Sequence, residues 1–322
     1  MGSSDECGSS IQCRLPDAGS QGHASYDQKV GPHAGTRRLP LVAPLLRLAR
    51  RGSLLIATDF DGTIAPVVRD PRRARPLPEA SRALAQLAAK TPVAVISARD
   101  LANLAQQCPI PGVLLLGSYG LEPWMRLTSD ERLPDRPPPS ERLVRLARDL
   151  QDLTDWLPGV QVETKAMGVA VHYRNSPEPR RAAQLVRRMV DQVASHEGLD
   201  VVRGKLVVEL RPPRSGNKGT ALAAILDRLE PRGCVFAGDD LGDLPAMEEL
   251  HRRRQDMELA LAIGILGQDG SPRLGEVADR CLDGPKAWAE LLQQLADSLP
   301  RGARLSPAPI APEDRSSPAA GR

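Results

Sequence analysis

The sequence has few aromatic residues, no closely spaced cysteines and no long apolar run. Phe, Tyr and Trp together make up 2% of the 322 residues, so a core has to be built from Leu, Val, Ile and Ala. The five cysteines are widely spaced and form no CxxC pair, which argues against both a disulfide framework and a zinc site. No window of about 18 apolar residues occurs, and the N-terminus lacks the basic-then-apolar pattern of a signal peptide. These absences predict a cytoplasmic globular protein without membrane contacts.

Neither sign of charge dominates the sequence. The formal net charge is +3, a small excess for a chain of this length. The arginines are scattered and form no sustained basic face, and few aromatic residues are present to stack on bases, which weighs against nucleic-acid binding. The length allows two domains of about 150 residues each.

Strands and helices alternate in two separate parts of the chain. Apolar strands are predicted at residues 54–58, 93–96, 113–116, 234–237 and 259–265, and helices at residues 78–89, from 100, 219–229, 245–253 and 286–299. Continuous apolar strands between helices are typical of a parallel sheet that is covered on both faces. We therefore expect an α/β, Rossmann-like core formed by residues 37–133 and 212–299.

The central segment, residues 134–211, has a different pattern, which reads αββαββ. Ser140 can cap a first helix, a second is predicted at residues 180–196, and Pro-rich stretches connect the segment to the core. The predicted hairpin strands are residues 160–164 and 169–173, then residues 199–202 and 206–210 with a turn at Arg203-Gly204. This order predicts an inserted α+β cap domain with an antiparallel sheet. The polar ends, residues 1–36 and 300–322, are predicted to be disordered.

Polar residues gather where predicted strands end, which is the edge at which open α/β sheets bind ligands. The first strand runs into Asp59 and Asp61, and the strand after the insert runs into the sequence GDDLGD at residues 238–243. The full set is Asp59, Asp61, Ser97, Lys218, Asp239, Asp240 and Asp243. Each motif alone is compatible with a simple turn, but their order and their common position at strand ends favour a single site.

These residue types suit phosphoryl transfer. Clustered carboxylates repel one another unless a cation lies among them, and Mg²⁺ prefers such oxygen ligands together with a substrate phosphate. One Asp can attack phosphorus to form an aspartyl-phosphate, and an acid two residues on can protonate the leaving group and then activate water. We therefore assign Asp59 as nucleophile and metal ligand, and Asp61 as acid/base and as a ligand through its main-chain carbonyl.

The other members of the set are expected to complete the site. Asp239 is the third predicted protein ligand of the metal, with Asp243 and Asp240 in support. Ser97 and Lys218 are expected to hold the phosphoryl oxygens while charge shifts in the transition state.

Seven motifs resemble those of trehalose-6-phosphate phosphatases, a family of the haloacid dehalogenase-like superfamily: DFDGTIAP, SAR, GSYGLE, VETK with VHYR, GKLVVELRP, NKG and GDDLGD. The resemblance extends over about residues 40–298. It implies a haloacid dehalogenase-like core with a cap, and Mg²⁺-dependent hydrolysis of trehalose 6-phosphate as the last step of trehalose biosynthesis. It also implies that the substrate contacts Asp59, Phe60, Asp61, Arg99, Ser118, Tyr119, Glu163, Lys165, Arg174, Lys205 and Glu209.

The chain departs from the family pattern at three motifs. Ala98 replaces a Gly beside the site, Tyr119 replaces a His, and Gly242 replaces a Thr in the last acidic motif. The acidic residues of that motif are retained, so the departures affect their surroundings and not the predicted ligands.

Alternatives remain at this level. Period-two spacing places Glu163 with Lys165, and Lys205 with Glu209, on one face of the cap sheet, which is either a sugar site or a solvated face with ion pairs. Another enzyme of the superfamily would act on sucrose phosphate or mannosyl-phosphoglycerate. A catalytically silent module that regulates a trehalose-6-phosphate synthase is a third possibility, and such a synthase is a candidate partner in any case.

Overall fold

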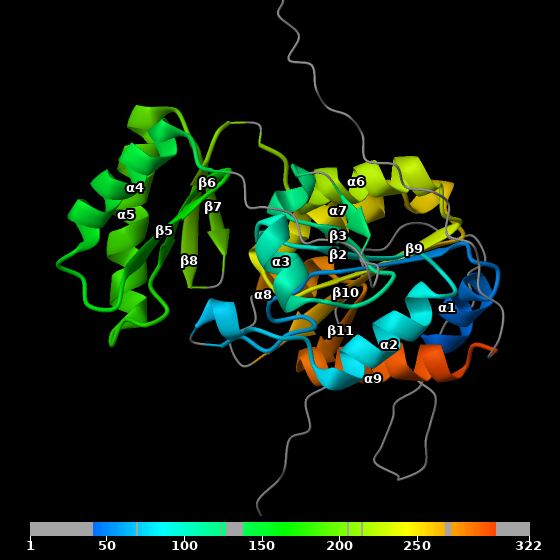
Figure 1. Cartoon of the computed structure of the whole chain (residues 1–322). Coiled ribbons are helices and arrows are strands. Elements are labelled where there is room, and N and C mark those ends of the chain that lie inside the picture. Colours follow the sequence, from blue (N-terminus) through cyan, green and yellow to red (C-terminus); the bar gives the residue numbers. More distant parts are fainter. Residues whose placement is uncertain are drawn as a thin grey trace, which may run out of the picture.

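The structure is a computed structural model that describes residues 41–68, 70–122, 124–126, 138–204, 206–213, 215–267 and 272–300. The described part of the chain contains two sheets, a larger one with seven strands and a smaller one with four (Figure 1). Apart from residue 300, the two tails that we predicted to be disordered lie outside the described residues. So does Lys205.

The larger sheet has the strand order β11-β10-β9-β1-β2-β3-β4. Its strands are β1 (Leu54–Thr58), β2 (Val93–Ile96), β3 (Leu114–Leu116), β4 (Met125–Arg126), β9 (Gly233–Gly238), β10 (Leu259–Leu266) and β11 (Arg280–Asp283). All neighbours are parallel except β4, which runs antiparallel to β3 at one edge. The chain fills one side from β1 to β4 and the other from β9 to β11, so the strand order reverses beside β1, where open sheets bind ligands.

Helices cover both faces of this sheet (Figure 1). One face carries α1 (Val42–Ala49), α2 (Pro78–Ala88), α3 (Leu101–Gln107) and α9 (Gly284–Asp297), and the other carries α6 (Lys218–Leu229), α7 (Leu244–Arg252) and α8 (Pro272–Val277). Successive residues of β1 point to opposite faces, so Leu54 and Ile56 pack in the first layer and Leu55 and Ala57 in the second. Burial on both faces explains why these strands are continuously apolar.

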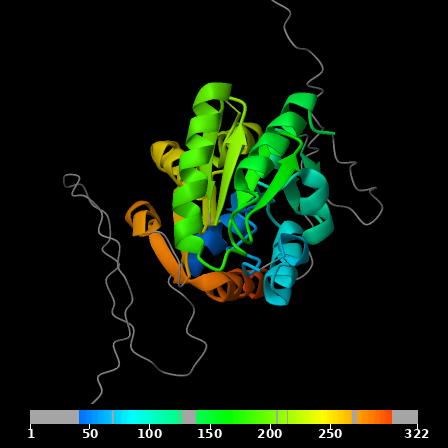
Figure 2. The same ribbon diagram turned by 90° about the vertical axis from the view of Figure 1, so that its left-hand side faces the viewer.

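The smaller sheet is antiparallel, with the order β5-β6-β8-β7. It consists of β5 (Gln161–Lys165), β6 (Gly168–His172), β7 (Asp200–Gly204) and β8 (Val207–Arg211), packed against α4 (Glu141–Thr154) and α5 (Pro179–Glu197). Ser140 caps α4, as predicted, because its Oγ accepts a hydrogen bond of 3.3 Å from Leu143 N. The two helices cover the face that points away from the larger sheet, which leaves the other face directed at it (Figure 2).

The predicted fold class is confirmed, with one wrong turn and four missed elements. The predicted turn at Arg203-Gly204 is wrong, because both residues belong to β7 and Gly204 pairs with Val207. Leu206, just before Val207, adopts a left-handed φ of 61°. Four elements, α1, β4, α8 and β11, were not predicted from the sequence. None of the helices in the described part of the chain has the length and apolar character that a bilayer crossing requires.

Asp279 joins three elements at one edge of the larger sheet. Its Oδ2 accepts from Ala262 N at 2.8 Å and lies 3.3 Å from His251 Nε2, and its Oδ1 accepts from Arg254 at 2.5 Å. Burial alone would raise the pKa of Asp279, but hydrogen bonds from these three groups hold it below its ordinary value. The carboxylate form therefore stabilises the folded state.

We expect Asp279→Asn to lower the free energy of unfolding at pH 7 by about 1–3 kcal/mol, since charge-assisted hydrogen bonds are lost. Because the folded-state pKa is depressed, this contribution is present above the unfolded pKa of about 3.9 and is lost as the pH falls through the folded value. Urea unfolding at pH 7 and below pH 4 measures both effects. The exposed Asp256→Asn is the matched control, and a difference that does not shrink in acid contradicts the prediction.

Candidate active site

The end of β1 places Asp59 at the centre of the larger sheet. Asp59 N donates to Ala237 O at 2.8 Å, so the pairing with β9 continues past the strand, and only 4% of Asp59 is exposed. Thr58 Oγ1 donates to Asp59 O at 2.9 Å and accepts from Trp288 Nε1 at 3.2 Å. Trp288 of helix α9 is therefore linked through Thr58 to the main-chain carbonyl of Asp59.

Three buried acids meet at this point. Asp59, Asp239 and Asp243 each offer one carboxylate oxygen, and these oxygens all lie within 4.8 Å of one another. Two glycines make the approach possible: a Cβ on Gly62, which has φ +85°, would overlap the Asp239 carboxylate, and a Cβ on Gly238 would overlap that of Asp243. The sequence needs Gly after the second Asp of DFDG and before the first Asp of GDDLGD for this reason.

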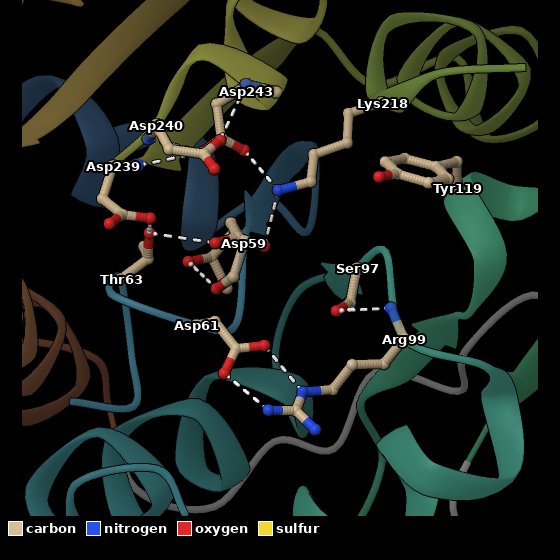
Figure 3. Close-up of polar contacts among 12 residues, drawn as sticks. Asp59, Asp61, Thr63, Ser97, Arg99, Tyr119, Lys218, Asp239, Asp240 and Asp243 are labelled. Atoms are coloured by element: carbon tan, nitrogen blue, oxygen red, sulfur yellow. Dashed lines mark hydrogen bonds and ion pairs between the residues drawn. The ribbon is translucent and has the colours of Figure 1, made fainter. Parts of the chain in front are cut away.

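Lys218 supplies the opposite charge (Figure 3). Its Nζ lies 2.6 Å from Asp59 Oδ1 and 2.7 Å from Asp243 Oδ1, and the residue is 4% exposed. It is the first residue of α6, which Asn217 and Thr220 fix with reciprocal capping hydrogen bonds. Burial opposes the charged form of Lys218, but Asp243 and Asp59 outweigh it and raise its pKa. Lys218 is therefore an ammonium group in this site.

Lys218 contacts two of the three acids, and one ammonium would leave the cluster negatively charged if all three were ionised. Burial raises the pKa of Asp59 well above its usual range against the effect of Lys218, and Asp243 and Asp239 raise it further. Burial likewise raises the pKa of Asp243 to about 6, although Lys218 acts against it. The donor set is oxygen only and has an excess of negative charge, which fits a divalent cation such as Mg²⁺.

The acids are not equivalent as ligands. Asp243 Oδ1 accepts from Lys218, and its Oδ2 accepts from Asp239 N at 3.0 Å and Asp240 N at 3.1 Å, so Asp243 mainly organises the loop. Thr63 Oγ1, which the sequence analysis did not single out, lies 3.4 Å from Asp59 Oδ2 and 3.5 Å from Asp239 Oδ1. Asp59 and Asp239 are consequently the better carboxylate ligands.

Asp61 points away from this cluster (Figure 3). Arg99 holds both of its oxygens, with Nε 2.6 Å from Oδ2 and Nη2 2.7 Å from Oδ1. The Arg99 guanidinium also lies 5.2 Å from the centre of the Phe60 ring. The predicted acid/base is therefore oriented by a bidentate ion pair, an arrangement that neither motif reveals alone.

Most of the predicted residues line one cavity of about 160 Å³ between the two sheets. They are Asp59, Asp61, Ser97, Arg99, Tyr119, Glu163, Lys165, Arg174, Glu209, Lys218 and Asp240. The Phe60 side chain is fully buried and Ser118 Oγ donates to Glu122 at 2.5 Å, so neither side chain is among the lining groups. The predicted contacts of Phe60 and Ser118 with the substrate stay predictions.

The pairing register of β5, β6 and β8 determines which side chains form the cap wall of the cavity. Glu163 pairs with Ala170 and Ala170 with Glu209, so two carboxylates flank a small residue on one face of the sheet. His172 lies two residues beyond Ala170 on the same face, and its Nε2 is 2.8 Å from Glu163 Oε2. His172 was not predicted as a lining residue, although period-two spacing from Ala170 places it on this face.

Arg174 crosses from the cap to the core. Its Nη1 donates to Val68 O at 2.6 Å, in the loop that follows β1. Burial lowers the pKa of Arg174 below its ordinary value, and nearby Asp61 partly offsets this effect. Arg174 thus places positive charge where the cap meets the core, next to the Asp61–Arg99 pair.

Comparisons with known proteins agree with this site. A sequence model of the trehalose-phosphatase family matches residues 57–268. The trehalose-phosphate phosphatase of Mycobacterium avium is 36% identical over 249 residues, which cover 76% of this chain and 62% of that protein. The chain thus spans less than two thirds of the length of this relative.

Two solved structures are similar in fold. The C-terminal domain of C. albicans trehalose-6-phosphate phosphatase gives a TM-score of 0.64 at 22% identity, covering 83% of this chain and 99% of the domain. The C-terminal domain of the Candida albicans trehalose synthase regulatory protein gives 0.55 at 14% identity, covering 76% and 94%. At these identities the likenesses establish the fold alone.

We expect Lys218→Met to lower the free energy of unfolding by about 3–5 kcal/mol, because two buried carboxylates lose their cation. Asp243→Asn in the Lys218→Met background should recover part of this loss. Urea unfolding at neutral pH measures both. Lys165→Met is the matched control, since Lys165 also lines the cavity but has one carboxylate partner, Glu209, at 3.4 Å. A loss below about 1 kcal/mol for Lys218→Met contradicts the assigned role of the ammonium.

Proposed function

Because the chain belongs to the trehalose-phosphatase family, we propose that it hydrolyses trehalose 6-phosphate to trehalose and inorganic phosphate. One observation carries the proposal: Asp59 of the acid cluster, its partner Lys218 and the polar wall of the cap sheet line the same cavity. Phosphoryl chemistry and recognition of a polyhydroxylated leaving group can therefore take place on one substrate.

In the proposed first step, a carboxylate oxygen of Asp59 attacks phosphorus and the bond from phosphorus to the sugar oxygen breaks. Protonated Asp61 gives its proton to the leaving alkoxide, which departs as trehalose. Lys218 and Ser97 stabilise the charge on the phosphoryl oxygens. The product on the protein is an aspartyl-phosphate at Asp59.

In the proposed second step, Asp61 takes a proton from water while the water oxygen attacks the phosphorus of the aspartyl-phosphate. The acyl–phosphate bond breaks, phosphate leaves, and Asp59 and Asp61 return to their starting forms. Arg99 orients Asp61 by donating to both oxygens of its carboxylate form, and one of these contacts opens when Asp61 carries the proton. Positioning of this kind is expected to matter in both steps.

We assign the metal site to the Asp59 and Asp239 carboxylates and the main-chain carbonyl of Asp61, with Asp243 in support. When bound, Mg²⁺ supplies positive charge that offsets the buried carboxylates and the phosphoryl oxygens. The excess negative charge of the cluster supports this assignment.

Sugar recognition is proposed for the cap wall. Glu163, Lys165 and Glu209 offer acceptors and donors in alternation, which suits hydroxyl groups that both donate and accept. Lys205, outside the described residues, keeps its predicted role on the basis of the sequence alone. The cytoplasmic location and a synthase partner likewise stay predictions.

A regulatory module without activity is the second candidate, because a regulatory protein's domain has the same fold. The retained Asp59 and Asp61, both lining the cavity, favour the enzyme.

Phosphate release from a panel of esters tests the proposal. We expect kcat/KM for trehalose 6-phosphate to exceed that for glucose 6-phosphate, sucrose 6-phosphate and mannosyl-phosphoglycerate by about 100-fold or more, since buried polar groups left unpaired discriminate strongly. A preference for sucrose 6-phosphate supports the rival enzyme. Absence of any hydrolysis supports the silent module.

Asp59→Asn should reduce kcat by about 1000-fold or more, because the attacking oxygen is replaced by an amide of nearly the same shape. Thermal unfolding of the variant serves as the control for folding. Activity within tenfold of the wild type contradicts the role of Asp59 as nucleophile.

Removal of divalent cations with EDTA should abolish activity, and Mg²⁺ should restore it whereas Ca²⁺ restores it poorly, because Ca²⁺ has longer bonds and a higher coordination number. Mg²⁺ should also raise the unfolding temperature of the wild type and not that of Asp239→Asn, since a cation bound only to the folded state stabilises it. Full activity in EDTA contradicts the metal assignment.

A further inference from the structure

Tyr119 belongs to the core, but its side chain contacts the cap. Its hydroxyl donates to Glu209 Oε2 at 3.0 Å, and the Arg211 guanidinium lies 4.0 Å from the centre of its ring. Both partners are on β8, two residues apart and therefore on one face of the cap sheet. Tyr119 is 7% exposed and Glu209 is 6% exposed, so this contact is largely shielded from water.

The contact orients a carboxylate from two directions. Lys165 Nζ, from the cap's own sheet, lies 3.4 Å from the same Oε2 that accepts from Tyr119. Among the described residues, Oε1 of Glu209 has no such partner, which leaves it to accept from a ligand in the cavity. Tyr119 acts as a donor throughout the neutral range, because burial and the nearby Glu209 raise the pKa of its hydroxyl well above the ordinary value.

The backbone at Tyr119 is held in an unusual conformation. Ser118 and Tyr119 have φ of 48° and 60°, a left-handed region that residues other than glycine rarely adopt. Two hydrogen bonds hold the turn: Ser118 N donates to Arg99 O at 2.6 Å, and Tyr119 N donates to Ser97 O at 2.9 Å. The turn that aims the ring at the cap is thus attached to the segment that carries the phosphate-binding candidates, and strain of this kind is concentrated at functional sites.

We propose that Tyr119 is a positioning residue for sugar recognition, whose hydroxyl orients Glu209 so that the carboxylate can accept a hydrogen bond from a sugar hydroxyl. The proposal rests on the proposed function and deepens it. Glu209 has both of its donors only where the cap lies against the core, because Lys165 belongs to the cap and Tyr119 belongs to the core. Figure 3 shows the Tyr119 hydroxyl turned toward the space beside Lys218, so the oriented carboxylate and the phosphoryl site serve one substrate. Phosphate esters that lack a sugar gain nothing from it.

Tyr119→Phe is the direct test, since it removes the hydroxyl and keeps the ring under Arg211. For trehalose 6-phosphate we expect kcat/KM to fall by about 10- to 100-fold, mainly through KM, because a charge-assisted hydrogen bond that positions a binding group is lost. For p-nitrophenyl phosphate, kcat/KM should stay within twofold of the wild type. Tyr173→Phe is the matched control, because Tyr173 is an equally buried tyrosine that packs on the helix side of the cap; it should change neither activity.

A double-mutant cycle separates positioning from a merely structural role. Once Glu209→Ala has removed the acceptor, adding Tyr119→Phe should lower kcat/KM by no more than twofold. The proposal is overturned if the two effects add, if Tyr119→Phe changes trehalose 6-phosphate hydrolysis by less than twofold, or if both substrates fall together. In the last case Tyr119 acts through the backbone at Ser97 and Arg99.

Failure of the proposed function gives a different result. If the wild type prefers another sugar phosphate of the panel, the substrate assignment is wrong, and the cycle run with that ester still decides the role of Tyr119. If the wild type hydrolyses p-nitrophenyl phosphate and no sugar phosphate, both proposals are overturned.

Discussion

The contact of Lys218 with Asp59 and Asp243 determines how the rest of the site can be built. A buried carboxylate among other carboxylates is unstable as an ion, and a single ammonium cannot balance three of them. The fold tolerates this cluster because the three acids follow two neighbouring strands, β1 and β9. The pairing of these strands continues to Asp59 N, which donates to Ala237 O. The remaining negative charge suits a cation, which in the proposed function also offsets the charge of the phosphoryl group. Stability and chemistry are thus set by one cluster.

A second constraint is that the site is divided between two sheets. The core provides the acids, whereas the wall opposite them comes from the cap strands, where Ala170 lies between Glu163 and Glu209. Arg174 and Glu209 each bond across the seam, to Val68 O and to Tyr119. In the proposed function, a leaving group that contacts both walls is held in one orientation relative to Asp59. This division lets one core chemistry serve different substrates through different cap residues.

The acids and the main strands could be predicted from the sequence because their signals are local. An apolar run that ends in DFDGT gives both the position of β1 and the carboxylates at its end, and β1 and β2 have the predicted bounds. Pairings between distant residues could not be predicted in this way. The ion pair of Asp61 with Arg99 depends on how two loops approach each other, and the Tyr119–Glu209 bond depends on the docking of two sheets. Leu206 in a left-handed turn, and strands as short as β4, lack any local signal that residue type could provide.

Fold alone does not separate an enzyme from a regulatory module here, since a regulatory protein's domain has the same architecture. The difference lies in whether the charged side chains at the strand ends contact one another as catalysis would require. In this chain the Lys218 ammonium lies 2.6 Å from the nucleophile candidate Asp59. Arg99 donates to both oxygens of the acid/base candidate Asp61. Buried charges are costly to maintain, and a module with no use for them would gain stability by replacing them with apolar groups. Their retention, with the glycines that make room for them, is the physical argument for catalysis.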